Sequence, residues 1–298
     1  MSQLATGTRT YSVTNYPRII FTQTVKEFKD FKRSNIGYVL ITAWIVISLF
    51  TIQNSFSKVD SIELLKYSDY FFWQNNVFYM LIFFILPSFS ISAERESGIL
   101  SLNRASSVNQ TGVVLGKLLF YFLLLLSLFS ISTVFTVVYL YLIKVEGFSF
   151  YTSTLILLSN QFIELWIGLS TISFAMMISS FARKKVTSVV ANILIALALL
   201  SISSNLLTYY DGSVIGSPVL SGIPFYAYLI LLLNPQNLTG ILAQHMGILT
   251  HLVTVGNATL TSGVPPIVAS GSNLLIALVV EIILFNSFSI FTTKRVNS

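Results

Sequence analysis

The sequence predicts an all-α, polytopic membrane protein whose 298 residues form a single domain with six transmembrane helices. Of these residues, 54% are apolar and only 9% are charged, whereas soluble domains carry roughly 25% charged residues. Several apolar runs also reach or approach the ~20 residues that a helix needs to cross the hydrocarbon core of a bilayer. The spans are expected at about 36–54, 73–93, 112–143, 153–182, 186–208 and 272–293.

Before the first span, residues 17–35 predict an amphipathic helix that lies in the membrane interface. Its apolar side chains recur at three- and four-residue spacing, and most of its basic side chains fall on the other faces. Pro17 is well placed to open such a helix. The alternative is a basic flank that only orients the first span. The apolar residues are Ile20, Phe21, Val25, Phe28 and Phe31, and the basic ones are Lys26, Lys29, Lys32 and Arg33.

The distribution of Lys and Arg predicts the orientation of the spans. With the N-terminus inside, only Lys58, Lys66 and Lys144 among the 17 basic residues fall in outer segments. Cytoplasmic segments of membrane proteins carry such an excess of Lys and Arg. We therefore expect both termini in the cytoplasm, a location in the cell (plasma) membrane, and a first span that is an uncleaved anchor. The net charge of +6 follows this topology, so no nucleic-acid partner is expected.

A dense polar segment, residues 94–110, separates the second and third spans and is expected in the cytoplasm. It begins with Glu94, Arg95 and Glu96, continues with Gly98, and carries a further cation at Arg104. In so apolar a chain, this segment is the predicted contact for an aqueous partner protein. Gly98 suits the tight turn that would start or bend a short helix. A second inner loop holds Arg183, Lys184 and Lys185, either as a second contact or only as topology-setting charge.

The last outer segment, residues 209–271, differs from the other loops. It contains no Lys or Arg and one acid, Asp211, and much of it is apolar. Its apolar runs, such as 223–233, are too short to cross a bilayer. We expect re-entrant or interfacial helices here, with a simple external domain as the alternative.

Catalytic and metal-binding motifs are absent from the sequence. Gly112 and the pair Gly116-Lys117 are one residue too close for a phosphate-binding loop, and Leu118 stands where a hydroxyl is required. The chain has no Cys, and its two histidines, His245 and His251, are six apart rather than four. We therefore expect no metal site, no cofactor and no enzymatic centre on this chain.

Two acids fall inside predicted spans, Glu164 and Glu281. A charged acid in the middle of a bilayer costs ~2.5–3.5 kcal/mol on insertion scales, so each is expected to face the bundle and find a partner. One interpretation is a carboxyl linked to protons or to substrate. The other is a hydrogen-bonded carboxyl that joins helices, with donors from nearby amides. The candidate donors are Asn160, Gln161, Asn192 and Asn286.

At the polar segment the chain resembles the permease subunits of type-2 ABC transporters. The residues that carry the resemblance are Ile91-Ser92-Ala93-Glu94-Arg95-Glu96-Ser97-Gly98-Ile99-Leu100, followed by Gly116-Lys117-Leu118-Leu119. In that family, Glu-x-Glu-x-Gly-Thr-Leu precedes a short coupling helix, and a Gly-Lys pair opens the third span. Here Ile99 replaces the Thr, and residues 102–107 lack the usual Leu-Leu-x-x-Pro-x-Ser-Arg run.

The resemblance implies a membrane subunit of an ATP-driven exporter. It implies six spans with both ends inside, an amphipathic N-terminal helix and a re-entrant region before the last span. Two such subunits, identical or homologous, would form the substrate path, and residues 94–107 of each would dock on a separate ATPase that binds ATP and Mg. In this scheme Glu94, Arg95 and Glu96 make ionic contacts with the ATPase. The alternatives are a secondary transporter or a scaffold membrane subunit without an ATPase.

Overall fold

The computed structural model describes residues 16–56, 77–105, 109–145, 148–212 and 271–295. This part of the chain is helical apart from short connections and contains no strand, which confirms the all-α class for it. Its helices are α1 (Tyr16–Arg33), α2 (Asn35–Phe56), α4 (Val77–Ser88), α5 (Ser90–Glu96), α6 (Ile99–Ala105), α7 (Gln110–Leu142), α8 (Phe150–Phe181), α9 (Lys185–Gly212) and α13 (Gly271–Arg295).

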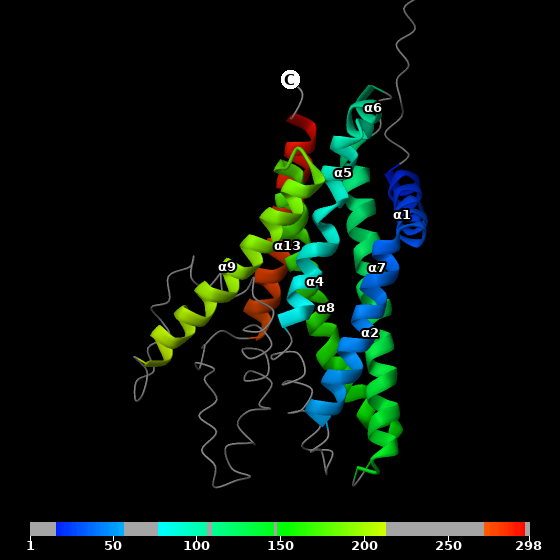
Figure 1. Cartoon of the computed structure of the whole chain (residues 1–298), viewed down its shortest axis with the longest axis vertical. Helices are drawn as coiled ribbons and strands as arrows, with labels where there is room; N and C mark the ends of the chain where they lie inside the picture. Colours follow the sequence, from blue (N-terminus) through cyan, green and yellow to red (C-terminus); the bar gives the residue numbers. More distant parts are fainter. Residues whose placement is uncertain (1–15, 57–76, 106–108, 146–147, 213–270, 296–298) are drawn as a thin grey trace, which may run out of the picture.

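The long helices run lengthwise in one bundle. In Figure 1, α7 and α8 extend along the long axis, α9 leans away from the others, and α1 is viewed nearly along its own axis, so it crosses the bundle. Three helical stretches within the described residues are long and apolar enough to cross a membrane: Gly37–Asn54, Gln110–Leu142 and Glu164–Phe181. The protein is therefore a helical membrane protein. The structure does not describe residues 213–270, so the expected re-entrant region lies almost entirely outside the described part of the chain.

The helix predicted over 73–93 is broken near its end. It is described from Val77 as two helices, α4 and α5, separated at Phe89. Pro87 lies inside α4, and proline has no backbone N–H and crowds the preceding turn, so it commonly bends a helix. The predicted span treated 73–93 as one helix, although Pro87 is a local signal for a break and α5 (Ser-Ile-Ser-Ala-Glu-Arg-Glu) is mostly polar.

Side chains from three neighbouring helices bind the backbone carbonyls at this break. The Ser88 carbonyl accepts hydrogen bonds from Ser179 at 2.9 Å and from Ser188 at 2.7 Å. Tyr121 donates to the Leu86 carbonyl at 3.2 Å. In an apolar surrounding an unpaired carbonyl is costly, so these hydroxyls stabilise the break and fix where α5 begins.

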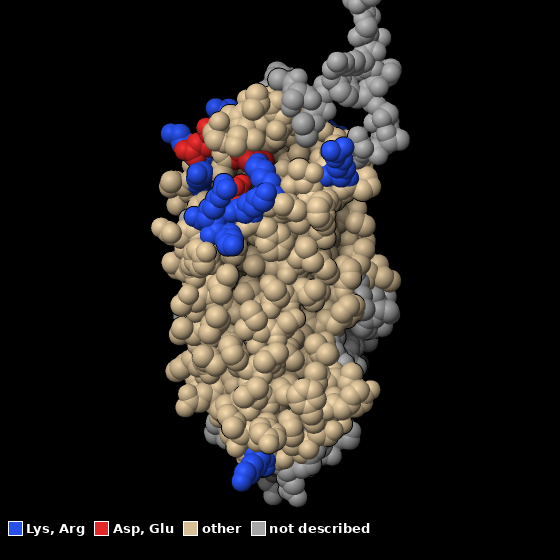
Figure 2. Space-filling view, turned by 90° about the vertical axis from the view of Figure 1, so that its right-hand side faces the viewer, with Lys and Arg blue, Asp and Glu red and all other residues tan. Residues whose placement is uncertain are grey.

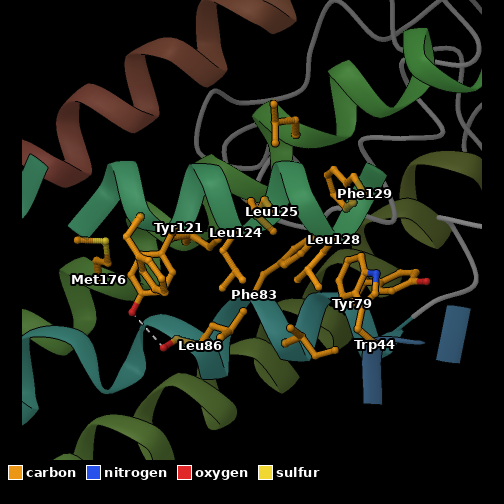
Figure 3. Packing of buried hydrophobic residues seen from close by; sticks show 14 of the residues in the cluster. Trp44, Tyr79, Phe83, Leu86, Tyr121, Leu124, Leu125, Leu128, Phe129 and Met176 are labelled. Carbon is orange, nitrogen blue, oxygen red and sulfur yellow. Dashed lines mark hydrogen bonds between the residues drawn. The ribbon is translucent and has the colours of Figure 1, made fainter. Parts of the chain in front are cut away.

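An aromatic core joins α2, α4 and α7 (Figure 3). Trp44 is fully buried, with its ring centroid 4.3 Å from that of Tyr79. The indole N–H donates to Ser132 at 2.9 Å, and Ser48 and Tyr79 share a hydrogen bond of 2.9 Å. Phe83 and Phe129 pack on the same cluster. Because the polar atoms of these large side chains are paired, the core holds the three helices in one fixed arrangement.

Candidate functional site

Charged side chains gather at one end of the bundle. Figure 1 places α1, α6, the start of α7 and the end of α13 at this end. Figure 2 shows Lys and Arg side chains grouped around acidic ones there, above a broad uncharged region. Lys144 follows the far end of α7 and therefore lies at the opposite end. We call the first end the charged end. The bundle thus has the charge asymmetry that membrane insertion imposes.

At the charged end, α5 and α6 are joined by a sharp turn. Gly98 has φ +75°, in the left-handed region that favours glycine, and its N–H donates to the Arg95 carbonyl at 3.1 Å. The seven-residue helix α6 follows directly. Leu100 of α6 is buried, whereas Leu102 is 68% exposed. The turn therefore presents a short helix with an exposed apolar side chain at the extreme end of the bundle. Arg104 also lies on α6.

Glu94, in contrast, is buried. It is 6% exposed, and its Oε1 accepts from Lys26 at 2.6 Å and lies 3.2 Å from the Lys117 ammonium. Lys117 is 1% exposed and binds Glu27 at 2.5 Å and the Ser90 carbonyl at 2.9 Å. Gln23 donates to Glu27 at 2.7 Å. The side chains of Glu94, Lys26, Lys117, Glu27 and Gln23, which we call the ion cluster, tie α1, α5 and α7 together.

The electrostatics of the ion cluster keep Glu94 ionised. Burial alone would raise the pKa of its carboxyl, but Lys117 and Lys26 together outweigh burial and hold the pKa below its ordinary value of 4.5. The cluster is thus a set of mutually compensating charges, as a buried ion pair requires.

Arg95 and Glu96 bind the corner between α8 and α9. The Arg95 guanidinium donates to the carbonyl of Ala182, which ends α8, at 3.0 Å. Glu96 accepts from the backbone N–H of Lys185, the first residue of α9, at 2.8 Å. Both contacts place each charge where the helix dipole favours it, the cation at a C-terminus and the anion at an N-terminus.

The structure therefore brings together the two predicted cytoplasmic contacts, residues 94–104 and 183–185. The sequence predicts that Glu94, Arg95 and Glu96 make ionic contacts with a partner, whereas the described contacts of all three lie within the chain. Their role in docking stays a prediction. The side chains of Arg183, Lys184 and Lys185 are exposed next to them.

The side chains that α1 packs and exposes differ from those expected for a simple interfacial helix. Val25 and Phe31 are partly buried, but Phe21 and Phe28 are exposed, as is Lys29. The face that packs on α7 includes the polar residues Gln23 and Thr24, and Thr24 donates to the Gly116 carbonyl at 2.9 Å. Helical periodicity identified the helix, but the apolar residues do not all lie on the packed face.

Two glycines of α7 allow this close approach of α1. A Cβ atom at Gly112 would lie 2.7 Å from Ile19, and one at Gly116 would lie 2.6 Å from the Gln23 Cβ and 2.8 Å from the Ile20 carbonyl oxygen. Small residues four apart let helix backbones approach in this way. The spacing that rules out a phosphate-binding loop thus suits a helix contact.

Glu27, Gln23 and Lys117 are the residues of the site that the sequence interpretation missed. Lys117 did carry a usable signal, because a lone cation within the first turns of a 33-residue apolar helix needs a buried partner. An acid on the preceding amphipathic helix is the natural candidate for that partner. No sequence spacing links Glu27 to Lys117, since 90 residues separate them.

The two acids predicted inside spans are both buried. Glu164 is 4% exposed, and Glu281 is 2% exposed and accepts a hydrogen bond from Ser170 at 2.6 Å. Two further pairs, Asn286 with Ser173 at 3.0 Å and Thr292 with Ser180 at 2.6 Å, continue this polar contact between α8 and α13. The donor to Glu281 is thus a serine, whereas amides were expected. Asn286 donates to Ser173, Gln161 accepts from Thr133, and Asn192 donates to the Ser188 carbonyl.

Among the described residues, no group of three His, Cys, Asp or Glu side chains could hold a metal ion. His245 and His251 lie outside the described residues. A scan against models of known protein families finds no match, and a search of curated proteins finds no significant match. Functional inference therefore depends on the sequence motif and on the geometry of the charged end.

Proposed function

We propose that this chain is the membrane-spanning subunit of an ATP-driven exporter of the type-2 ABC class. In this proposal it crosses the plasma membrane six times with both termini in the cytoplasm, and re-entrant helices precede the last span. It pairs with an identical or homologous subunit to form the substrate path. It hydrolyses no ATP itself and docks on a separate ATPase at the charged end.

One observation carries the proposal: three consecutive charged residues connect the segment that bears α6 to the rest of the bundle. Glu94 binds α1 and α7 through Lys26 and Lys117. Arg95 binds the end of α8, and Glu96 binds the start of α9. A displacement of α6 is therefore resisted by contacts on four other helices. A segment that only recruits a partner has no need of such connections, whereas a mechanical coupling element requires them.

The exposed surface of α6 is suited to the docking itself. Leu102 is 68% exposed at the end of the bundle, and apolar side chains that enter a pocket of a partner commonly dominate binding. We assign the docking contact to α6, with Glu94, Arg95 and Glu96 as the residues that transmit its movement. ATP-driven closure of two ATPases would move both α6 helices and, through these contacts, the rest of each bundle.

Copurification with the variant Leu102→Asp tests this assignment. The full chain is isolated from its native membrane in mild detergent, and its partners are identified by mass spectrometry. We expect a stoichiometric ATPase that is lost from Leu102→Asp, because a carboxylate would be buried in the docking pocket. Leu142→Asp is the matched control, since Leu142 is equally exposed but ends α7 at the opposite end of the bundle. The proposal would be contradicted if no ATPase copurified with the native chain, or if none copurified with the control.

A further inference from the structure

A cavity of about 390 Å³ lies behind α1 at the charged end. Residues of α1, α2, α4, α5, α6, α7 and the start of α9 line it. Its volume is within the roughly 300–1,000 Å³ of small-molecule sites. The cavity is distinct from the exposed α6 surface that we assign to the ATPase, so it can bind a different ligand.

The wall of the cavity carries equal numbers of basic and acidic side chains. The basic ones are Lys26, Lys117 and Lys185, and the acidic ones are Glu27, Asp30 and Glu94. Lys26, Lys117, Glu27 and Glu94 compensate one another within the ion cluster. A ligand with a net charge would therefore leave one side chain of the wall uncompensated.

Two charges on the wall remain available to a ligand. The Asp30 carboxylate and the Lys185 ammonium have no hydrogen-bond or ion-pair partner among the residues that the structure describes, and both side chains are exposed. One anion and one cation on the same cavity wall match a ligand that carries a cation and an anion itself. Lys26 is paired with Glu94, but its side chain is 38% exposed, so its ammonium can donate a further N–H to the anionic group.

The rest of the wall is apolar and aromatic. It includes Phe31, Leu40, Leu86 and Phe120. Such a surface accepts hydrocarbon. The ligand is therefore amphipathic, with a zwitterionic polar part and an apolar part.

The position of the cavity identifies the class of amphiphile within reach. On α1, which covers the cavity, Phe21 and Phe28 are exposed beside basic residues, a pattern typical of helices at the boundary between headgroups and acyl chains. Figure 2 shows this face, with the charged end directly above the broad uncharged region. Phospholipid headgroups lie at this boundary in a membrane.

We propose that this cavity binds the headgroup of a zwitterionic phospholipid with a primary amine, that is, of the ethanolamine type. The ammonium donates to Asp30, the phosphate accepts from Lys185 and Lys26, and the start of an acyl chain packs on Phe31 and Phe120. The site does not depend on the proposed transport function, because lipid binding requires no ATPase.

Native mass spectrometry of the full chain in detergent tests this site, with ethanolamine, choline and glycerol phospholipids of identical acyl chains added in equal amounts. We expect one ethanolamine lipid to be retained, about tenfold more tightly than the anionic glycerol lipid. The variants Asp30→Asn and Lys185→Gln should each weaken its retention by about tenfold, the usual effect of losing one charge-assisted hydrogen bond. Lys184→Gln is the matched control, because Lys184 is exposed and adjacent but does not line the cavity.

A second variant and a soluble competitor complete the test. Ser97→Trp, at an exposed position of the wall, should abolish retention by filling the cavity while leaving the ion cluster intact. Glycerophosphoethanolamine, which has no acyl chains, should not displace the lipid at equal concentration. Full displacement by it would assign the cavity to a soluble zwitterion and overturn the lipid proposal. Equal retention of all three lipids, or unchanged retention in Asp30→Asn and Lys185→Gln, would also overturn it.

Discussion

At the scale of single residues, Lys117 is the least exposed charged side chain in the part of the chain that the structure describes. It is almost fully buried and binds two carboxylates and a carbonyl. Replacing one partner of a buried ion pair leaves the other charges uncompensated, which typically costs about 3–5 kcal/mol. We expect Lys117→Met to lower the stability of the purified protein by about this amount. Thermal unfolding in detergent measures the effect.

The control for Lys117→Met is Lys29→Met, which removes an exposed lysine of α1. Surface charges contribute little to stability, about 0–1 kcal/mol, so its unfolding temperature should stay close to that of the native chain. Equal effects of the two variants would show that the ion cluster does not stabilise the bundle.

The ion cluster also predicts how stability depends on pH. The folded state holds the pKa of Glu94 below its ordinary value of 4.5, so folding favours the ionised carboxylate. Its contribution is fully present above the unfolded pKa of about 4.5 and is lost as the pH falls through the lower folded value. We expect the melting temperature to fall in this acidic range. Glu94→Gln should lack this component, and an identical acid transition in that variant would contradict the assignment.

At the scale of elements, the contact between α1 and α7 depends on Gly116. A Cβ atom there would meet the Gln23 Cβ and the backbone of Ile20 at less than 3.0 Å, and a backbone cannot move aside without shifting the helix. We expect Gly116→Ala to displace α1 and to cost about 1–3 kcal/mol, as overpacking does. Thermal unfolding and protease cleavage within α1 measure the two effects.

Gly168→Ala is the matched control for this contact. Its Cβ would lie 3.1 Å from a terminal carbon of Leu125 and 3.4 Å from the Phe83 ring, where flexible side chains can adjust. We expect a smaller loss of stability and no new cleavage in α1. Cleavage of α1 at the native rate in Gly116→Ala would contradict the close-packing account.

Most of the helices could be predicted from the sequence, whereas one break was not predicted. Hydropathy and helical periodicity were sufficient for the helices at α1, α2, α7, α8, α9 and α13, because these signals are local. The break at Phe89 was missed, although Pro87 two residues earlier is a local signal for it. The turn at Gly98 was predicted, because a glycine after charged residues is a local signal as well.

Most of the candidate site could not be predicted, because its contacts join residues far apart in the chain. Glu94 and Lys26 are 68 positions apart, and Glu96 and Lys185 are 89 apart. The polarity of residues 94–110 predicted that Glu94 would be exposed and would contact a partner protein. The structure buries it, since Lys26 and Lys117 approach from two other helices and compensate its charge. Only the packing of α1 on α7 creates that environment.

At the scale of the whole molecule, the charge asymmetry predicts how the bundle is oriented. The chain has no native cysteine, so single-cysteine variants can be labelled without background. We expect an impermeant thiol reagent to label Leu142→Cys on intact cells. The reagent should reach Leu102→Cys only after the membrane is permeabilised, because the proposed orientation places α6 in the cytoplasm. Labelling in the reverse pattern would contradict both the orientation and the docking proposal.

Crosslinking in the native membrane tests whether α6 docks on an ATPase, as we propose. A photoactivatable reagent is attached to Leu102→Cys or, as the control, to Leu142→Cys, and the crosslinked proteins are identified by mass spectrometry. We expect Leu102→Cys to capture an ATPase with a phosphate-binding loop and Leu142→Cys to capture none. Capture of no ATPase from Leu102→Cys, or equal capture from both positions, would contradict the docking proposal.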